Sequence, residues 1–388
     1  MINRKIILDV DHSFFLFGAR GTGKSTLLKS QNFLSKDTMW IDLLNPSIEE
    51  KYSLHPEFLT QEIDFLSKKP KWVVIDEIQK VPKLLDVVHQ LIESTEIQFV
   101  LTGSSSRKLK RIGSNLLAGR AFNFKLFPMT SLEVGKSFNI HEHINWGGLP
   151  KIYNLKNINQ KSLYLKSYVE NYLKEEIIAE QILRNLNPFR LFLPLCMQNE
   201  TEPLNFTKIA EQTGVETKTI QNYYEILCDT HLGFFLNPYD KSVRSVQKRA
   251  PKFYFFDTGV HRAIEKKLKI TVESRSFEFG KLFESWFINE VHRYNEYFQL
   301  DYHISYLRTK DDAEIDLIIE RPDGSISLVE IKSSEVIEDR HLKHLISFKK
   351  DFPNADLVCI SNEKKARKVN DIQILPWKSS FKYLKLTC

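Results

Sequence analysis

Cysteine is scarce in this sequence, and long apolar runs are absent. The 388 residues include 4 cysteines, which stand far apart and form no Cys-x-x-Cys pair. This spacing argues against a zinc ribbon and against a scaffold held together by disulfides. No apolar run reaches the roughly 18 residues that cross a bilayer, and residues 1–17 lack the basic and then apolar layout of a signal peptide. We therefore expect a cytoplasmic protein with no membrane partner.

The excess of basic over acidic residues is also small. The chain has 55 Lys+Arg and 49 Asp+Glu, a net charge of +6. This excess permits nucleic-acid binding without establishing it, so only local basic clusters would indicate DNA. The 14 glycines and 14 prolines are scattered and form neither repeats nor a low-complexity linker. The content of 42% hydrophobic and 27% charged residues is typical of globular proteins, and the length suggests two or three domains.

A glycine-rich segment follows the first apolar run, Phe14–Phe17, which predicts a buried strand. Residues 18–25 fit G-x-x-x-x-G-K-[ST] between that strand and a predicted helix, the context that a phosphate-binding P-loop requires. Backbone N–H groups of such a loop surround phosphates, and the helix N-terminus adds the positive end of its dipole. Lys24 would reach the β- and γ-phosphates of ATP, and the Ser25 hydroxyl would coordinate Mg²⁺. The expected ATP-binding residues are Gly18, Ala19, Arg20, Gly21, Thr22, Gly23, Lys24, Ser25 and Thr26.

Residues 71–77 predict a second buried strand, which ends in two acids. Asp76 would hold Mg²⁺ and Glu77 would polarise the attacking water, a pairing that favours an ATPase over a GTPase switch. A third predicted strand, 97–101, ends in hydroxyl residues. Thr102 is the first candidate to sense the γ-phosphate and Ser104 the second, although either hydroxyl would equally suit a helix N-cap.

The elements GARGTGKSTLL, WVVIDEIQ, FVLTGSSS, LLAGRA, LFPMTSLE and GGLP occur in that order. Together they resemble a family of bacterial and archaeal AAA+-type ATPases. In that family a P-loop domain is fused to a C-terminal region with a winged helix and a PD-(D/E)XK nuclease-like fold. The resemblance implies the roles given above for the P-loop, the acidic pair and Thr102. It also implies an arginine finger at Arg120, acting in its own chain or on a neighbour in a homo-oligomer, and it includes Gln79 without giving it a role.

The resemblance covers nearly the whole chain and implies an α/β multidomain protein. The expected parts are a P-loop ATPase core with a parallel sheet and helices on both faces (1–135), a helical lid or connector (136–190), a winged helix (191–272) and a nuclease-like α/β domain (273–388).

A helix-turn-helix pattern occupies residues 206–224, with Gly214 at the turn. Two strand-like stretches follow and bracket a basic hairpin tip, the wing of a winged helix. DNA phosphates would be contacted by Lys241, Arg244, Lys248 and Arg249, and a DNA groove by Lys218, Thr219, Gln221 and Asn222. The same pattern also suits a winged helix that contacts protein or only packs.

Three polar residues mark the C-terminal region as a candidate metal-dependent nuclease core. Asp316 and Glu330 fall on two adjacent predicted strands, and Lys332 shares a face with Glu330 because strand side chains alternate. The two carboxylates would bind Mg²⁺ or Mn²⁺, with Glu284 from a preceding helix completing the site, and Lys332 would act on water and phosphate. These four residues resemble the PD-(D/E)XK core. Two departures are the missing proline before Asp316 and the missing Gln-x-x-x-Tyr pattern in the following helix.

Two functions remain open on the residues alone. One is an ATPase whose nucleotide state controls a DNA-binding and DNA-cleaving C-terminal region. The other is an ATP-switched regulatory or scaffold protein in which the nuclease-like domain only binds. The intact acidic residues with Lys332 favour the first, and the modest net charge favours the second.

Overall fold

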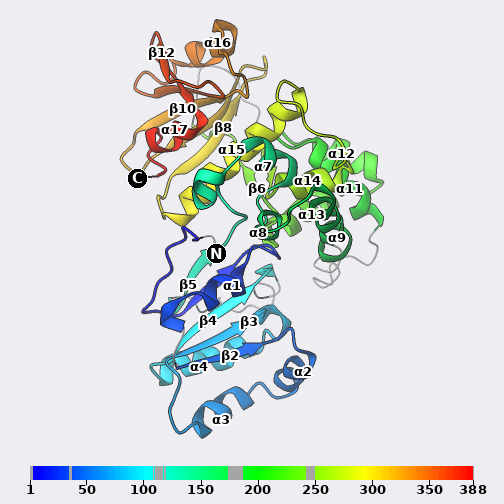
Figure 1. Ribbon diagram of the computed structural model, residues 1–388, viewed down its shortest axis with the longest axis vertical. Helices are drawn as coiled ribbons and strands as arrows, with labels where there is room; N and C mark the ends of the chain where they lie inside the picture. Colours follow the sequence, from blue (N-terminus) through cyan, green and yellow to red (C-terminus); the bar gives the residue numbers. More distant parts are fainter. Residues whose placement is uncertain are drawn as a thin grey trace.

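The computed structural model describes residues 3–34, 37–107, 109, 117, 119–173, 187–241 and 250–387. Figure 1 shows an N-terminal sheet, in blue and cyan, at one end of an elongated molecule and a C-terminal sheet, in yellow to red, at the other. A mainly helical region, in green, lies beside the long helix that leads into the C-terminal sheet. Within the described ranges, no helix has both the length and the apolarity needed to cross a bilayer.

Five parallel strands form the N-terminal sheet in the order β2-β3-β4-β1-β5. Their bounds are β1 Phe14–Phe17, β2 Thr38–Asp42, β3 Trp72–Asp76, β4 Gln98–Gly103 and β5 Phe122–Lys125. Alternate side chains face opposite sides, so Phe14 and Leu16 pack toward α1 (Lys24–Lys29), and Phe15 and Phe17 toward α4 (Leu84–Ser94). The α4 side also carries α2 (Pro46–Leu54) and α3 (Phe58–Phe65). The carboxyl ends of parallel strands share one edge, where the segments after β1, β3 and β4 meet.

The middle region is built mostly of helices around one hydrophobic cluster, which runs from Trp146 to Leu268 and also includes Ala19. A two-stranded antiparallel sheet, β6 with β7, follows the three helices α11 to α13. Gly214, with φ 68°, ends α12 in the left-handed conformation and allows the turn into α13. The bounds are α6 Ser131–Val134, α7 Ile140–Trp146, α8 Pro150–Tyr153, α9 Ile158–Ser167, a π-helical turn Tyr168–Leu173, α11 Asn187–Gln198, α12 Phe206–Thr213, α13 Thr217–Asp229, β6 Gly233–Leu236, β7 Lys252–Phe255 and α14 Thr258–Ile264.

The C-terminal sheet has six strands in the order β12-β13-β11-β10-β9-β8. The strands β8, β9 and β10 form an antiparallel meander, and β11 and β13 continue the sheet parallel to β10. A 21-residue helix, α15, precedes the meander, and α16 separates β10 from β11. The bounds are α15 Phe277–Tyr297, β8 His303–Arg308, β9 Glu314–Glu320, β10 Ile326–Ile331, α16 Asp339–Phe348, β11 Asp356–Ser361, β12 Arg367–Val369, β13 Ile372–Pro376 and α17 Trp377–Tyr383.

The hairpin β6–β7 continues onto the edge of the C-terminal sheet. Beyond β6, the Tyr239 N–H donates to the carbonyl of Tyr306 in β8 at 2.7 Å, and the Tyr306 N–H donates to the carbonyl of Asn237 at 3.1 Å. On the other side, the Asn289 amide of α15 donates to the carbonyl of Phe255 in β7 at 2.9 Å. Backbone pairing beyond β6 and a buried side chain at β7 therefore fix this two-stranded sheet against the C-terminal domain.

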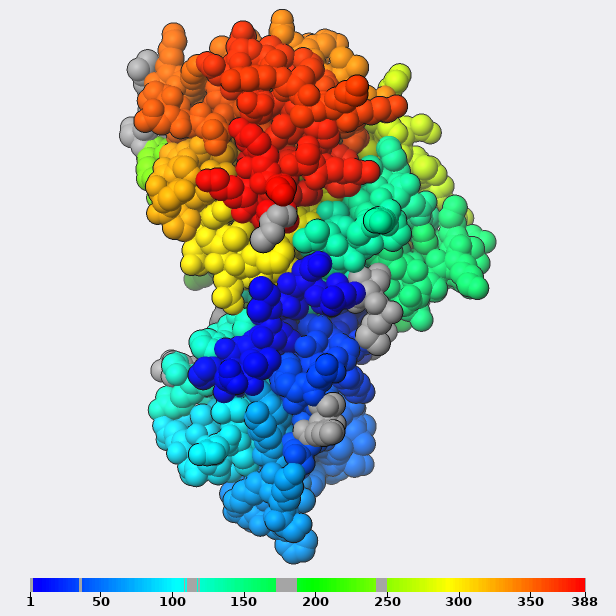
Figure 2. Space-filling view, turned by 60° about the vertical axis from the view of Figure 1, so that its left-hand side comes forward, coloured from blue at the N-terminus to red at the C-terminus, as the bar shows by residue number. Residues whose placement is uncertain are grey.

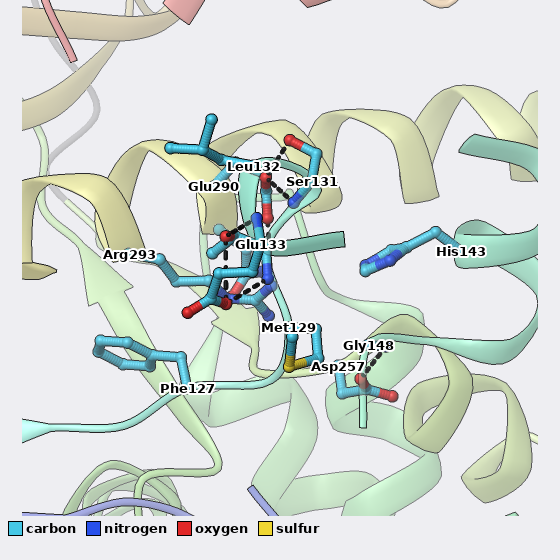
Figure 3. Close-up of polar contacts among 12 residues, drawn as sticks. Phe127, Met129, Ser131, Leu132, Glu133, His143, Gly148, Asp257, Glu290 and Arg293 are labelled. Carbon is cyan, nitrogen blue, oxygen red and sulfur yellow. Dashed lines mark hydrogen bonds and ion pairs between the residues drawn. The ribbon is translucent and has the colours of Figure 1, made fainter. Parts of the chain in front are cut away.

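A buried polar network joins the segment after β5 to α15 (Figure 3). The N–H and the hydroxyl of Ser131 both donate to Oε2 of Glu290, at 2.8 and 2.6 Å. The Tyr294 hydroxyl donates to the same oxygen at 2.8 Å, and Arg293 lies 3.3 Å from the other carboxylate oxygen. Burial raises the pKa of Glu290, and Arg293 and the Ser131 donors oppose this rise. The network holds the first turn of α6 directly on α15.

A second buried charged group lies where α14 meets α11 and α15. Nδ1 of His261 lies 2.5 Å from Glu200 Oε2, and its Nε2 lies 3.2 Å from Glu265 Oε2. The other oxygen of Glu200 accepts a hydrogen bond from the Ser285 hydroxyl at 2.6 Å. Burial disfavours the charged imidazolium, but Glu200 and then Glu265 outweigh burial and raise the pKa of His261 to about 9.

This arrangement predicts that the free energy of unfolding falls as pH rises. A histidine whose folded-state pKa is raised stabilises the protein fully below its unfolded value of about 6.5 and ceases to do so as pH passes its folded value. We expect a loss of up to about 3 kcal/mol between roughly pH 6.5 and pH 9, at 1.36 kcal/mol per pKa unit. Urea unfolding at several pH values would measure it. His261→Gln should reduce the slope of unfolding free energy against pH, whereas His12→Gln, at an exposed histidine, should not. Equal slopes in wild type and His261→Gln would contradict the prediction.

Candidate nucleotide site and carboxylate cluster

The P-loop lies between β1 and α1, as its sequence predicts. Gly21 and Gly23 have φ values of 81° and 94°, a left-handed conformation that lets consecutive N–H groups turn inward. Lys24 is buried, and its ammonium donates to the carbonyl of Gly18 at 2.8 Å. The ammonium also lies 3.9 Å from Glu77 Oε1. The loop is thus folded with its lysine beside the acidic strand.

The structure brings Ser25, Asp76 and Thr102 together at the carboxyl edge of the sheet. The Ser25 hydroxyl donates to Asp76 Oδ2 at 2.7 Å, and the Thr102 hydroxyl donates to Asp76 Oδ1. The strand that carries Thr102, β4, lies between β1 and β3, which is the position a γ-phosphate sensor needs. Hydroxyl and carboxylate oxygens are the ligands that Mg²⁺ prefers, so this donor set fits a nucleotide-bound Mg²⁺.

Gln79 and Ser104 hold the carboxylate of Glu77. The Gln79 amide donates to Glu77 Oε2 and to the Ser104 hydroxyl, the latter at 3.0 Å, and Ser104 donates to Glu77 Oε2 at 3.2 Å. Glu77 itself has φ 60°, a left-handed conformation that turns the chain out of β3. A Cβ at Gly103 would come within 2.7 Å of Gln79 Oε1, so a side chain there would displace Gln79. Gln79 and Ser104 therefore both contact the Glu77 carboxylate, which the sequence alone did not reveal.

Residues from outside the N-terminal sheet also contact the P-loop. The Tyr168 hydroxyl donates to the carbonyl of Arg20 at 2.8 Å, and Pro150 lies 3.7 Å from the position that a Cβ on Gly23 would take. Arg4 donates to the carbonyl of Thr22 at 3.0 Å. Sequence reasoning missed these residues because no motif marks a tyrosine or an arginine that meets the loop only in the folded chain.

Arg120 lies at the opposite edge of the sheet from the P-loop. It precedes β5, whose first residue Phe122 is aligned with Phe14 at the start of β1. Its guanidinium pairs with Glu93 of α4. Arg120 is therefore too badly placed to act as an arginine finger on the nucleotide of its own chain. Its action on the nucleotide of a neighbouring chain is still a prediction.

The residues predicted to contact DNA lie in different surroundings. Lys218 is exposed at the start of α13, and Lys241 pairs with Glu320 of the C-terminal sheet. Asn222, expected in a DNA groove, accepts a hydrogen bond at 2.7 Å from Arg107 of the loop after β4, so its amide oxygen is held by the N-terminal domain. Arg244, Lys248 and Arg249 lie outside the described residues.

Asp316, Glu330 and Lys332 converge on adjacent strands of the C-terminal sheet. The Lys332 ammonium lies 2.6 Å from Glu330 Oε1 and 3.8 Å from Asp316 Oδ2. Asp316 Oδ2 also accepts the N–H of Ile331 at 2.7 Å. Burial, followed by Asp316, raises the pKa of Glu330 to about 8, although Lys332 opposes the rise. Among the described residues, Glu330 Oε2 is buried without a hydrogen-bond partner.

Glu284 lies beside this cluster, together with two residues that the sequence did not single out. Lys252, at the start of β7, is fully buried and pairs with Glu314; its ammonium also lies 3.5 Å from Glu284 Oε1. The Tyr254 hydroxyl donates to the same Glu284 oxygen at 2.9 Å. Burial raises the pKa of Glu284 to about 7, which Lys252 counteracts.

The side chains of this cluster are of the kind that binds a divalent cation. In the part of the chain that the structure describes, no three His, Cys, Asp or Glu side chains are arranged to hold a metal ion. Mg²⁺, however, is commonly held by one or two carboxylates, with water and substrate phosphate as its other ligands. Asp316 and Glu330, with the unpartnered Oε2, supply two such carboxylates.

Comparisons with known families follow the same division of the chain. Residues 11–135 match a family model described as an AAA domain, residues 137–271 a domain of unknown function (DUF8612) and residues 279–380 a second domain of unknown function (DUF4143). With the loop geometry above, the first match supports an AAA-type P-loop ATPase domain of α/β fold with ATP as its nucleotide. The matches name neither a winged helix nor a nuclease.

Similar proteins occur in bacteria and archaea. An uncharacterized protein of Mycobacterium tuberculosis is 25% identical over 65% of this chain and 57% of its own length, so the chain matches little more than half of that relative. An uncharacterized protein of Methanocaldococcus jannaschii is 24% identical over 95% of this chain and 88% of its own.

Two solved structures are similar to parts of this chain. The Orc1 protein of Aeropyrum pernix in complex with DNA covers 66% of this chain and 86% of its own, with 12% identity and a TM-score of 0.27. The match to domain III of the replication initiation protein DnaA of Thermotoga maritima covers 55% of this chain and 83% of the other, with 17% identity and a TM-score of 0.23. At these TM-scores neither likeness carries an argument.

The contact of Tyr168 with the P-loop generates a prediction. Tyr168→Phe removes the hydrogen bond that holds the Arg20 carbonyl while keeping the buried ring. A net hydrogen bond contributes about 0.5–1.5 kcal/mol, so ATP affinity should fall by roughly 2- to 10-fold. Calorimetric titration with a non-hydrolysable ATP analogue would measure the change, with Tyr383→Phe, at an exposed tyrosine, as the control. Unchanged affinity in Tyr168→Phe would show that the loop keeps its shape without this contact.

Proposed function

We propose that this protein binds and hydrolyses ATP and that its nucleotide state acts on a DNA-binding C-terminal region. The observation that carries the proposal is the convergence of Lys24, Ser25, Asp76, Glu77 and Thr102 at one edge of the parallel sheet. These residues belong to the start of α1, the end of β3 and the end of β4, which are far apart in the sequence. Their types are those that phosphate binding, metal binding and activation of water require.

Each of these groups has a separate task in the proposed reaction. Backbone N–H groups of the loop and the Lys24 ammonium bind the phosphates, and Ser25 and Asp76 would hold Mg²⁺, which neutralises phosphate charge when bound. Glu77 accepts the proton of the attacking water, and Gln79 and Ser104 fix the direction of its carboxylate. Thr102 donates to Asp76 and accepts from the N–H of Glu77 at 3.1 Å, which places it between the metal ligand and the base.

We expect two substitutions to separate binding from hydrolysis. Lys24→Ala should lose ATP affinity because it removes the cation that faces the phosphates. Glu77→Gln should bind ATP normally and lose turnover by roughly 10²-fold or more, the usual effect of a general base. Steady-state phosphate release and calorimetric binding would measure both, with Glu50→Gln, at an exposed glutamate, as the control. Equal turnover in wild type and Glu77→Gln would remove Glu77 from the mechanism.

The proposed DNA-binding element is a winged helix formed by α11 to α13 with β6 and β7. The order of three helices followed by an antiparallel pair supports this assignment. Near the start of α13, Lys218 and Gln221 are exposed and stay available to DNA, although Asn222 contacts the N-terminal domain. A cavity of about 670 Å³ lies beside this part of α13 and is lined by Thr217, Gln221 and Arg308, among others. Arg308 lies 3.2 Å from Glu314, so the cavity leads toward the carboxylate cluster.

A second proposed activity is metal-dependent DNA cleavage at the carboxylate cluster. Glu330 Oε2, buried and unpartnered among the described residues, is the observation that favours it. The helix, three-stranded meander, helix and parallel strand formed by α15, β8–β10, α16 and β11 are consistent with the PD-(D/E)XK core that the sequence resembles. Asp316 and Glu330 would hold one Mg²⁺ or Mn²⁺, which supplies Lewis-acid chemistry, and Lys332 orients water toward the phosphate. The alternative is a domain that binds DNA without cutting it.

Variants of the cluster should distinguish cleavage from binding. Glu330→Gln and Asp316→Asn should lose the metal and DNA cleavage together. Lys332→Ala should keep the metal and lose cleavage by roughly 10²-fold, as for removal of one preorganised electrostatic contact. Linear, supercoiled and branched DNA with Mn²⁺, with and without ATP, would be the substrates, and Lys343→Ala, on the exposed face of α16, the control. ATP hydrolysis should survive all these changes. A wild type that binds DNA but neither cuts it nor binds Mn²⁺ would favour the alternative.

A further inference from the structure

The buried ammonium of Lys252 belongs to the middle region, yet it lies inside the carboxylate cluster of the C-terminal domain. Lys252 pairs with Glu314 and lies 3.5 Å from Glu284. On its remaining side the Tyr306 ring lies 5.1 Å away, which adds a cation–π contact. A lysine with no exposed surface is rare unless it is paired, and here both oxygen partners are acids.

The backbone holds this lysine in place from both sides. β7 is paired with β6 at Leu236↔Lys252, and β6 leads into the residues that pair with Tyr306 of β8. The Tyr306 hydroxyl also donates to the carbonyl of Ala250. Tyr254 lies on the same face of β7 as Lys252 and donates to Glu284. Main-chain pairing therefore fixes the backbone of Lys252, and Glu284, Glu314 and the Tyr306 ring hold its ammonium.

The charges of the cluster divide into two halves. One half, which we call the inner half because it surrounds the fully buried ammonium of Lys252, contains Glu284 and Glu314. Their positive partners are Lys252 and, at Glu314, Arg308. The outer half contains Asp316 and Glu330, whose partner is the half-buried Lys332 near the surface. The unpartnered oxygen, Glu330 Oε2, belongs to the outer half. The inner half is thus neutralised by fixed cations, and the outer half retains an acceptor for another cation.

We propose that Lys252 is a resident counter-charge, so that the cluster binds a single divalent cation, in its outer half, on Asp316 and Glu330. Glu284 is then a partner of Lys252 and Tyr254, not a metal ligand. A second divalent cation beside Glu284 and Glu314 would meet the Lys252 ammonium at close range, where like charges repel strongly in a poorly solvated site. Lys252 is a positioning residue in this scheme, and the docked middle region completes the site. The inference rests on the proposed metal-binding function.

Metal stoichiometry tests this proposal without relying on activity. Nucleotide-free full-length protein carrying Asp76→Asn, which removes the P-loop metal ligand, would be titrated with Mn²⁺ and followed by paramagnetic resonance of the free ion. We expect one Mn²⁺ per chain in this parent. We expect one in Lys252→Arg, which keeps the charge, and one in Lys269→Gln, an exposed control. Lys252→Met should bind a second Mn²⁺, because the inner carboxylates lose their counter-charge.

Glu284→Gln is an independent test in case Lys252→Met does not fold. It should keep the single Mn²⁺. Glu330→Gln should lower Mn²⁺ affinity by more than the roughly 10- to 100-fold that changes outside the direct metal ligands cause. Two Mn²⁺ ions in the parent, or loss of the ion in Glu284→Gln, would overturn the role of Lys252 while leaving metal-dependent cleavage intact. No Mn²⁺ in the parent would overturn the proposed metal-binding function itself.

Discussion

Glu290, buried without any exposed surface on α15, ties the two ends of the molecule together. An uncompensated carboxylate at such a position would cost several kcal/mol. Here two donors of Ser131, the Tyr294 hydroxyl and the Arg293 guanidinium compensate it. Ser131 follows shortly after β5, which pairs directly with the P-loop strand β1. The N-terminal sheet therefore cannot move away from α15 without leaving a buried charge unpaired.

Arg4 extends this constraint to the nucleotide site. Its guanidinium donates to the Thr22 carbonyl in the P-loop, to the Tyr297 hydroxyl on α15 and to Glu133, and Figure 2 shows the dark blue N-terminal segment lying across the narrow part of the molecule. Tyr297 and Glu284 lie on the same helix, roughly 20 Å apart at 1.5 Å per residue. One rigid element thus spans the distance from the phosphate-binding loop to the carboxylate cluster. A change in loop geometry on binding phosphate would act first on the Arg4 contact, at the end of that helix.

Sequence reasoning succeeded where chemistry is local or where strand order follows from a motif. The P-loop could be predicted because its eight residues carry their own backbone requirement. Thr102 could be placed beside Asp76 because parallel strands share one edge. The roles of Arg4, Tyr168 and Lys252 could not be predicted, since each depends on a partner that only the folded chain brings close. Nothing in the local sequence separates Lys252 from the other lysines of a chain whose Lys and Arg residues number 55. Arg120 is the opposite case. Its sequence resembles an arginine finger, but it lies at the edge of the sheet away from the P-loop of its own chain.

The polar contacts between the three regions argue against treating them as independent modules. Arg107, after β4, is largely buried and binds both Asn222 and Asp229 of α13, so this helix is tied to the N-terminal domain. Lys252 binds the C-terminal acids in the same way from the other side of the middle region. Moving one partner of such a pair away while the other stays buried would leave a buried charge or donor uncompensated, which costs free energy. The middle region therefore serves as a polar bridge, and a motion that it transmits must exchange these contacts for others rather than simply break them.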